Sequence, residues 1–361
     1  MSVVTSISTL LDIVRRESAI SGRSVFSILT GALRAKVSYG LGYKYFIMTG
    51  LAREDFNPNE VAKHLSSKDY TRAIEILNPL AYRKITQHKF VEKALYNALH
   101  INSAELLGYY HFQRGVTAQG DPLNDIVQLS DYLTNFVGQK ICFKLCEGWS
   151  GKGFYAGTIE MQNGELSVRK LFSDERIKLR DLIETFVNDD NEVELIFERY
   201  VTQAAGIAQF NDTSVNTIRA WVLDDGSKIE LIGAVIRIGR KGSLTDNSGA
   251  GGITVGIDIK TGTLRQGLLP ADPVRPNLTQ HPDTKAQLTG VVIPRWKEIV
   301  DFSCEVLKRL PQTHFVGLDI SLTEDGPLLI ETNPLPDKDS AAKGPIPAIK
   351  LKQAAQKWLS K

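Results

Sequence analysis

The sequence contains few cysteines and no sign of the features that accompany secretion. Its only cysteines are Cys142, Cys146 and Cys304, in a chain of 361 residues. Their number is odd and no C-x-x-C spacing occurs, so neither a disulfide framework nor a cysteine zinc site is indicated. The first residues lack the basic start and apolar core of a signal peptide. We therefore expect a cytoplasmic protein with reduced thiols.

Long apolar runs and charge of one sign are also missing. No uninterrupted apolar stretch approaches the ~20 residues that span a bilayer. The nearest, Tyr43 to Leu51, is interrupted by Lys44. The net charge is +2, so no overall field attracts nucleic acid or an anionic membrane. We expect no transmembrane segment and no nucleic-acid partner, and the sequence is compatible with a homodimer.

Several common catalytic signatures are absent. Gly151-Lys152 is followed by Gly153 where a Walker A loop requires Ser or Thr, and no G-x-G-x-x-G opens a helix. The six histidines form no H-E-x-x-H or triad-like setting. We interpret most of them as surface or packing residues, with His281, in a His-Pro-Asp-Thr loop, as the exception worth testing.

The pattern along the chain predicts an α+β protein. The first ~85 residues have helical periodicity and caps, such as Asn57 before Pro58 and Ser66 before Asp69. From Ile126 onward, short β-rich runs alternate with turn signals. The helical part therefore precedes a sheet-rich body.

The most specific motif lies near the C-terminus, where two apolar runs flank Asp325-Gly326 and predict a hairpin. If Leu322 pairs with Leu328, then Asp319 lies opposite Glu331, and Asn333 falls on the same face. Neighbouring buried carboxylates repel each other unless a cation sits between them, and oxygen-only ligands suit Mg²⁺. The alternative is a solvent-facing polar stripe on an ordinary hairpin.

Three basic residues stand within apolar strands. Lys144 needs an anionic partner there, and the glycine-rich turn after it could bind phosphate through backbone N–H groups, or could be a neutral hairpin tip. Arg219 and Arg237 cannot lose their charge, so each needs an anion. A phosphate chain, a carboxylate substrate or a structural ion pair would serve. The run Glu194 to Val201 predicts a strand that ends at a polar turn, or simply a core strand.

The order of these motifs resembles the ATP-grasp superfamily, and above all its sugar-transfer associated branch. The similarity covers roughly residues 40 to 336, and its closest pieces are Val215–Arg219, Asp246-Asn247, Gly251-Gly252, His281–Thr284, Val316–Asp319 and Glu331–Asn333. Arg219, Arg237 and Asn247 also resemble the ribosomal-protein glutamate ligases. There an Arg precedes the paired glycines, but here the position is Ala250.

The resemblance implies an ATP-grasp fold with ATP and Mg²⁺ as cofactors. It implies a helical region over residues 1–85, a subdomain with the glycine-rich loop over 86–200 and a subdomain with the metal site over 201–361. It also implies that Lys144 contacts the α and β phosphates, and that Asp319, Glu331 and Asn333 hold the metal. Arg219 and Arg237 would face the γ-phosphate or an acyl phosphate.

Further nucleotide contacts follow from the same resemblance. A loop over the phosphates would comprise Gly148, Ser150, Gly151 and Gly153, and the adenine-binding hinge Glu198, Arg199, Tyr200 and Val201. A first ATP lysine is expected just before the nucleotide fold, where Lys89 fits best and Lys93 is its rival. Gln203 is the nearby candidate for a ribose contact.

The reaction that the resemblance implies is ligation with release of ADP. A small-molecule carboxylate would attack the γ-phosphate, and an amine or other nucleophile would displace phosphate from the acyl phosphate, in polysaccharide or secondary-metabolite biosynthesis. Two alternatives stay open. One is a kinase for a small molecule or sugar, and the other is a nucleotide-binding subunit without catalysis.

Overall fold

Helices form the first part of the chain, as expected. The computed structural model describes residues 3–148, 153–188, 192–269, 272–274, 278–343 and 346–360. The helices that precede the first strand are α1 (Val3–Ser21), α2 (Val25–Tyr39), α3 (Tyr43–Met48), α4 (Pro58–Val61), α5 (Ser67–Leu77), α6 (Leu80–Arg83), the 3₁₀ turn η1 (Lys84–Thr86) and α7 (Lys89–Ala98). The predicted caps are confirmed, because Asn57 and Ser66 accept from the backbone N–H groups of Asn59 and Asp69.

The first of two sheets has seven strands, in the order β2-β1-β7-β3-β4-β5-β6, and each neighbouring pair is antiparallel. Its strands are β1 (Leu106–Tyr110), β2 (Val116–Thr117), β3 (Lys140–Leu145), β4 (Phe154–Gln162), β5 (Glu165–Lys170), β6 (Arg176–Lys178) and β7 (Leu195–Arg199). Helices α8 (Ile126–Thr134) and α9 (Leu179–Glu184) contribute Leu129, Leu182 and other apolar side chains to its core. The segment from Ile126 onward, which the sequence predicted to be rich in strands, therefore begins with helix α8.

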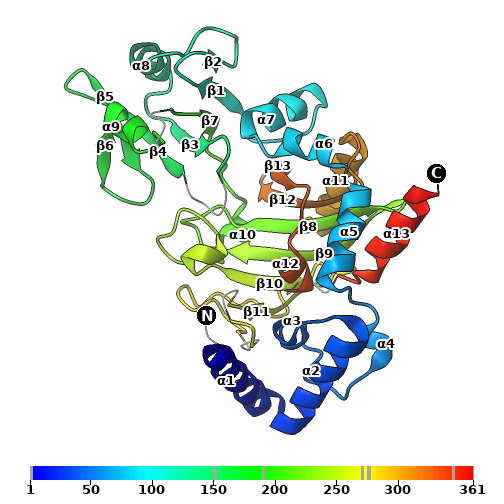
Figure 1. Ribbon diagram of the computed structural model, residues 1–361. Coiled ribbons are helices and arrows are strands. Elements are labelled where there is room, and N and C mark those ends of the chain that lie inside the picture. Colours follow the sequence, from blue (N-terminus) through cyan, green and yellow to red (C-terminus); the bar gives the residue numbers. More distant parts are fainter. Residues whose placement is uncertain are drawn as a thin grey trace.

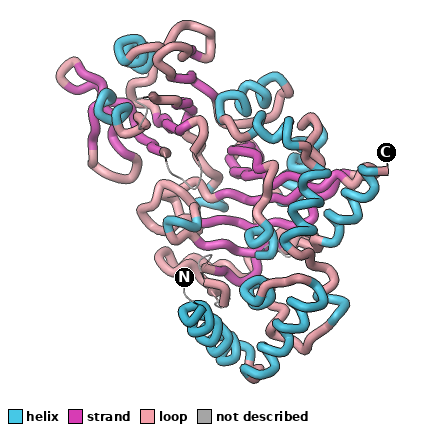
Figure 2. The backbone as a smooth tube through the Cα atoms, in the orientation of Figure 1, coloured by secondary structure: helices cyan, strands magenta, loops and turns pink. Residues whose placement is uncertain are grey.

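The second sheet has six strands, in the order β11-β10-β9-β8-β12-β13, again with antiparallel neighbours. Its strands are β8 (Thr217–Asp224), β9 (Ile229–Ile238), β10 (Ile253–Ile257), β11 (Leu264–Leu268), β12 (Phe315–Thr323) and β13 (Gly326–Asn333). The remaining helical segments are α10 (Ala205–Ala208), η2 (Ser248–Ala250), α11 (Trp296–Arg309), α12 (Lys338–Lys343) and α13 (Ile349–Leu359). Figures 1 and 2 show the two sheets side by side, with α1 and α2 at the end of the molecule beyond the six-stranded sheet.

Helices cover both faces of the six-stranded sheet. Alternate residues of β8, such as Ile218 and Val222, pack in one core with Ile299 and Val306 of α11. Residues between them, such as Trp221, form a second core with α5 and α13, which also pack against each other. Helices α1 to α3 and residues up to Val61 have a separate core. The helices before residue 85 are thus divided between two cores, because α5 covers the sheet.

Candidate functional site

A row of charged side chains crosses the six-stranded sheet. Asp319 on β12 is paired with Glu331 on β13 and with Arg219 on β8. Directly paired residues point to the same face of a sheet, so these three side chains lie together. Arg237 on β9 is paired with Thr217, two residues from Arg219, and belongs to the same face. The sheet register therefore places two arginines beside two carboxylates.

The hairpin that carries the carboxylates contains a β-bulge. The predicted pairing of Asp319 with Glu331 is confirmed, but the pairing of Leu322 with Leu328 was wrong, since Leu322 lies opposite Pro327. The register shifts between Asp319 and Ile320, and Ile330 is the extra residue on β13. A bulge bends and twists the strand that contains it. This one lies directly beside Glu331.

Asp319 is buried and held by both arginines. Arg219 forms a bidentate ion pair with Asp319 through its Nε and Nη2 atoms, and the distance from Nη2 to Oδ2 is 2.9 Å. The Nη2 of Arg237 donates to the same Oδ2 of Asp319 at 2.6 Å. Burial by itself raises the pKa of a carboxyl group, but the two guanidinium groups hold the pKa of Asp319 well below its usual range. Burial and the neighbouring Asp319 carboxylate raise the pKa of Glu331.

The donor set at this position fits Mg²⁺. Asp319, Glu331 and Asn333 offer only oxygen among their metal-binding atoms. Burial and the Asp319 carboxylate both raise the pKa of Glu331, and a cation beside it would favour its charged form. Within the described ranges, no group of three or more His, Cys, Asp or Glu side chains has a metal-binding arrangement. An ion here would therefore rest on two carboxylates and one amide, with the remaining ligands supplied by water or a bound phosphate.

A buried glutamate anchors two lysines on the other sheet. Glu198 on β7 forms ion pairs with Lys144 on β3 and with Lys93 on α7, whose Nζ lies 2.8 Å from Oε1. Burial disfavours the charged form of Glu198, but the two ammonium groups outweigh it and lower the pKa of its carboxyl group. Burial alone would lower the pKa of Lys144, but the charge of Glu198, its hydrogen bond and other nearby acidic groups together raise it. The Glu198 carboxyl group and the Lys144 amine are therefore both charged at neutral pH.

Lys93 also reaches the second sheet, because its Nζ donates to the carbonyl of Ile330 at 3.1 Å. Lys89, one helical turn earlier, donates to the carbonyl of Gly148 at 2.7 Å. Both rivals for the first ATP lysine therefore lie beside the same space. Gly153 has a positive φ of 68°, and a Cβ added there would lie 2.2 Å from Cδ1 of Leu145. Ser150 and Gly151 lie outside the described residues.

These groups face one cavity of about 650 Å³ between the two sheets, which we call the inter-sheet cavity. Its lining includes every expected site residue that the structure describes, apart from Gln203: Lys89, Lys144, Gly148, Gly153, Glu198, Arg199, Tyr200, Val201, Arg219, Arg237, Asp319, Glu331 and Asn333. Residues far apart in the sequence thus meet around one space with cations on both walls.

Two expected residues have structural surroundings instead. The carboxamide of Gln203 donates to the carbonyls of Asn211 and Ser214 and accepts from Asn216, so its side chain stabilises a turn away from the inter-sheet cavity. His281 is fully buried, and its Nδ1 accepts from the backbone of Asp283 and Thr284. Neither side chain is among the described residues that line that cavity.

The structure also shows contacts of two acidic residues to which the sequence analysis gave no role. Glu92, beside Lys93 on α7, lines the inter-sheet cavity and accepts from the backbone N–H of Thr332 at 2.7 Å. Burial is the main reason that its pKa rises to about 7. Asp246 accepts from the N–H of Thr217 at 3.0 Å and lies 3.5 Å from Arg237 Nε. The sequence offered one signal for Glu92: it and Lys93 are adjacent charged residues on the face of an amphipathic helix that becomes buried.

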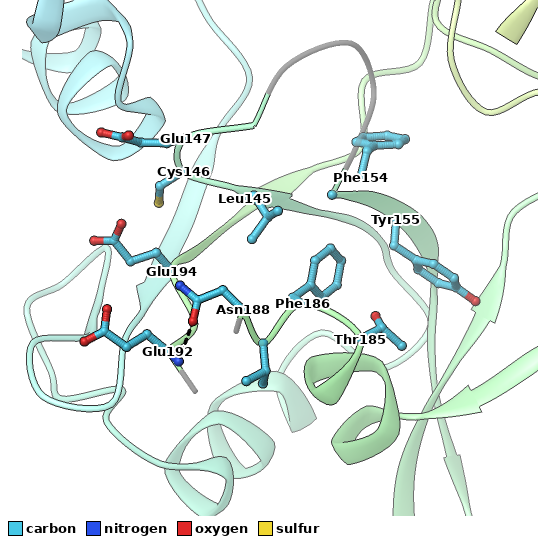
Figure 3. A pocket seen from close by; sticks show the side chains of 12 residues that line it. Leu145, Cys146, Glu147, Phe154, Tyr155, Thr185, Phe186, Asn188, Glu192 and Glu194 are labelled. Atoms are coloured by element: carbon cyan, nitrogen blue, oxygen red, sulfur yellow. Dashed lines mark hydrogen bonds between the residues drawn. The ribbon is translucent and has the colours of Figure 1, made fainter. Parts of the chain in front are cut away.

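A second cavity adjoins the first at Leu145, Glu147, Gly153 and Phe154, and its charged lining is acidic. It measures about 510 Å³, and Figure 3 shows Glu147, Glu192 and Glu194 along one side with Phe154 and Phe186 on the other. No Lys, Arg or His is among its described lining residues. Its Cys146 thiol is buried, which raises the pKa to about 12 and opposes a thiolate. Phosphate groups would be repelled here, so the inter-sheet cavity is the better candidate for a nucleotide.

Comparisons with known families agree with this geometry. The model of the sugar-transfer associated ATP-grasp family matches residues 67–340. The chain belongs to this family. Its fold is accordingly the ATP-grasp fold, with a helical N-terminal region whose first 66 residues lie outside the family match. No curated protein shows detectable sequence similarity to the chain.

Solved structures of low sequence identity are similar to parts of this ATP-grasp chain. D-alanyl-alanine synthetase A from Vibrio cholerae is 14% identical, with 77% of this chain and 66% of that chain covered and a TM-score of 0.41. N5-carboxyaminoimidazole synthetase from Staphylococcus aureus, complexed with ADP, is 11% identical, with 70% and 46% covered and a TM-score of 0.39. The chain thus spans less than half the length of the latter. Among the described residues, no helix has the length and apolar character needed to cross a bilayer.

Proposed function

We propose that this protein is an ATP- and Mg²⁺-dependent ligase that activates a carboxylate as an acyl phosphate and couples it to an amine or another nucleophile. One observation supports the proposal above the others. Arg219, Arg237 and the Asp319–Glu331 pair lie on one wall of the inter-sheet cavity, and Lys93 and Lys144 lie on another. Fixed cations on two sides suit a phosphate chain that ends near the carboxylates.

The proposed reaction has two steps. An oxygen of the substrate carboxylate forms a bond to the γ-phosphorus of ATP, and the bond to the bridging oxygen breaks, releasing ADP. A nucleophile then attacks the acyl carbon, loses its proton and displaces inorganic phosphate. A bound Mg²⁺ would neutralise charge on the phosphate oxygens.

The residues of the chain act mainly by position and charge. Lys144 and Lys93 would bind phosphate oxygens while Glu198 keeps their ammonium groups in place. Arg219 and Arg237 would stabilise the charge that develops on the transferred phosphoryl group, because guanidinium groups stay charged at any working pH. Asp319 orients both arginines through its two oxygens. No side-chain nucleophile is needed in this scheme.

The decisive experiment measures ADP release from the full chain with panels of carboxylic acids, amines and sugar-containing nucleophiles, followed by mass spectrometry of the product. An amide or ester together with free phosphate supports the ligase. A stable phosphorylated acceptor would replace it with a kinase, and nucleotide binding without turnover across the panel would remove the catalytic role. The family's name motivates the sugar-containing acceptors, and we propose polysaccharide or secondary-metabolite biosynthesis as the setting.

A further inference from the structure

Helix α2 carries an apolar stripe on its exposed side. Phe26, Leu33 and Val37 keep 77%, 64% and 77% of their surface exposed, whereas Ile28 and Ala35 of the same helix are buried. At about 100° per residue, the three exposed side chains fall within roughly 40° of one another, opposite the buried face. The stripe is therefore continuous, and the helix is apolar on two opposite sides.

Basic residues border this stripe on both sides. Arg34 and Lys36 lie about 80° to either side of Phe26 on the helical wheel, and both are exposed. Helix α2 contains no acidic residue. The first 48 residues hold six Lys and Arg against two Asp and Glu, although the net charge of the whole chain is only +2. This basic excess is confined to α1 to α3, because residues 49–60 hold one Arg against three Asp and Glu.

We propose that the exposed face of α2, defined by Phe26, Leu33, Val37, Arg34 and Lys36, docks on the surface of an anionic lipid bilayer. Apolar side chains flanked by Lys and Arg are the arrangement with which a helix lies in a membrane interface. The apolar stripe enters the boundary between headgroups and acyl chains. The two cations pair with lipid phosphates at the level of the headgroups.

The charge pattern favours lipid over a second copy of the chain. A two-fold contact places the same patch on both partners. Two α2 helices in such a contact would bring Arg34 and Lys36 near their own counterparts, with no carboxylate on either helix to offset them. Helix α2 also lies outside the residues that match the family model, at the end of the molecule opposite the seven-stranded sheet (Figure 1). Docking there leaves the inter-sheet cavity open to small molecules.

The test is flotation of the full chain with vesicles of pure phosphatidylcholine and with vesicles of equal parts phosphatidylcholine and phosphatidylglycerol. We expect binding to the anionic vesicles that weakens with salt. Arg34→Gln with Lys36→Gln should lower partitioning roughly 25-fold, about fivefold for each cation removed. Leu33→Ser with Val37→Ser should lower it at least roughly tenfold.

Matched controls alter equally exposed residues elsewhere. Leu80→Ser with Val127→Ser removes apolar side chains that are 75% and 63% exposed, and Lys308→Gln with Lys352→Gln removes two exposed cations. Both controls should bind vesicles like the unaltered chain, and unchanged thermal unfolding verifies that each variant is folded. Equal loss in the controls, equal binding to neutral vesicles or no vesicle binding would overturn the proposal. If the unaltered chain binds no vesicles but forms a dimer, and only the α2 variants abolish that dimer, the exposed face of α2 would be assigned to contact with a second copy of the chain.

Discussion

The ammonium group of Lys93 lies 2.8 Å from a carboxylate oxygen of Glu198, and the two side chains are 2% and 1% exposed. The same ammonium donates to the carbonyl of Ile330 on the other sheet. One buried ion pair thus connects the seven-stranded sheet, helix α7 and the bulge beside Glu331. Its energetic role is to compensate a charge that would be costly alone in this position.

The first prediction concerns this pair. Lys93→Met removes one of the two cations around buried Glu198 and should destabilise the fold by about 3–5 kcal/mol, because a poorly compensated charge remains. Urea unfolding measures the change. Lys89→Met is the matched control, since Lys89 donates to a backbone carbonyl, and should cost only about 1 kcal/mol. Adding Glu198→Gln to Lys93→Met should restore part of the loss, and a purely additive double variant would contradict the coupling.

The second prediction concerns the metal site. Glu331→Ala should abolish Mg²⁺-dependent ATP turnover, because one of the two carboxylates that would hold the ion is lost. The protein should remain folded, since burial and Asp319 already oppose a charged Glu331. Circular dichroism and ADP release measure the two properties. Glu305→Ala, on the exposed side of α11, should retain activity. A folded and fully active Glu331→Ala protein would show that the ion is held elsewhere.

The third prediction separates charge from geometry at Arg219. Arg219→Lys keeps the positive charge but loses the planar guanidinium group, which binds both carboxylate oxygens of Asp319. We expect kcat/KM for ATP turnover to fall by roughly 10²–10³, the cost of removing one preorganised donor to developing charge. Arg176→Lys, at an exposed ion pair on β6, should leave the rate unchanged. Equal rates for Arg219→Lys and the unaltered chain would leave Arg219 with a structural role alone.

The fourth prediction concerns the pH dependence of stability. Burial raises the pKa of Glu92 to about 7, so the folded chain holds this proton more tightly than the unfolded chain does. The stability that this provides is complete below about pH 4 and disappears as the pH rises through about 7. The loss amounts to roughly 4 kcal/mol, given a normal glutamate pKa near 4.3 in the unfolded chain.

Comparison with Glu92→Gln isolates this contribution from other titrating groups. The amide retains an oxygen that accepts from the N–H of Thr332, but it cannot ionise. Urea midpoints measured below about pH 4 and above about pH 8 should therefore converge at low pH, with the variant more stable at high pH. The exposed Glu184→Gln should follow the unaltered chain. Parallel pH profiles for Glu92→Gln and the unaltered chain would show that Glu92 titrates normally.

The sequence predicted the local features of the site better than its long-range ones. Alternation along the C-terminal hairpin put Asp319 opposite Glu331, and this pairing is confirmed because the extra residue, Ile330, offsets the one-residue error in the predicted register at the turn. The bulge at Ile330 was missed, since nothing in a run of apolar residues marks the extra one. Arg219 and Lys144 each needed an anionic partner, and these partners are Asp319 and Glu198. The sequence analysis had already named both carboxylates, Asp319 for the metal and Glu198 for the adenine-binding hinge.

Other features depended on contacts that no local pattern encodes. Strand β1 was not expected, because Leu106–Tyr110 is short and becomes a strand by pairing with β7, far along the chain. Gln203 was chosen for its position after the hinge, but its carboxamide bonds neighbouring loop groups. Both Lys89 and Lys93 line the inter-sheet cavity, so the choice between them as the first ATP lysine stays a prediction.

The packing of α5 across the six-stranded sheet determines where the chain can be shortened. Removal of residues 1–85 would strip the cover from Trp221 and Leu223, on the face that also bears Arg219 and Asp319. A protease-resistant core should therefore begin before Leu65. A polypeptide cut near that point would keep the ATP-grasp lobes intact while losing the cationic helices, and nucleotide binding could then be studied without the terminal module.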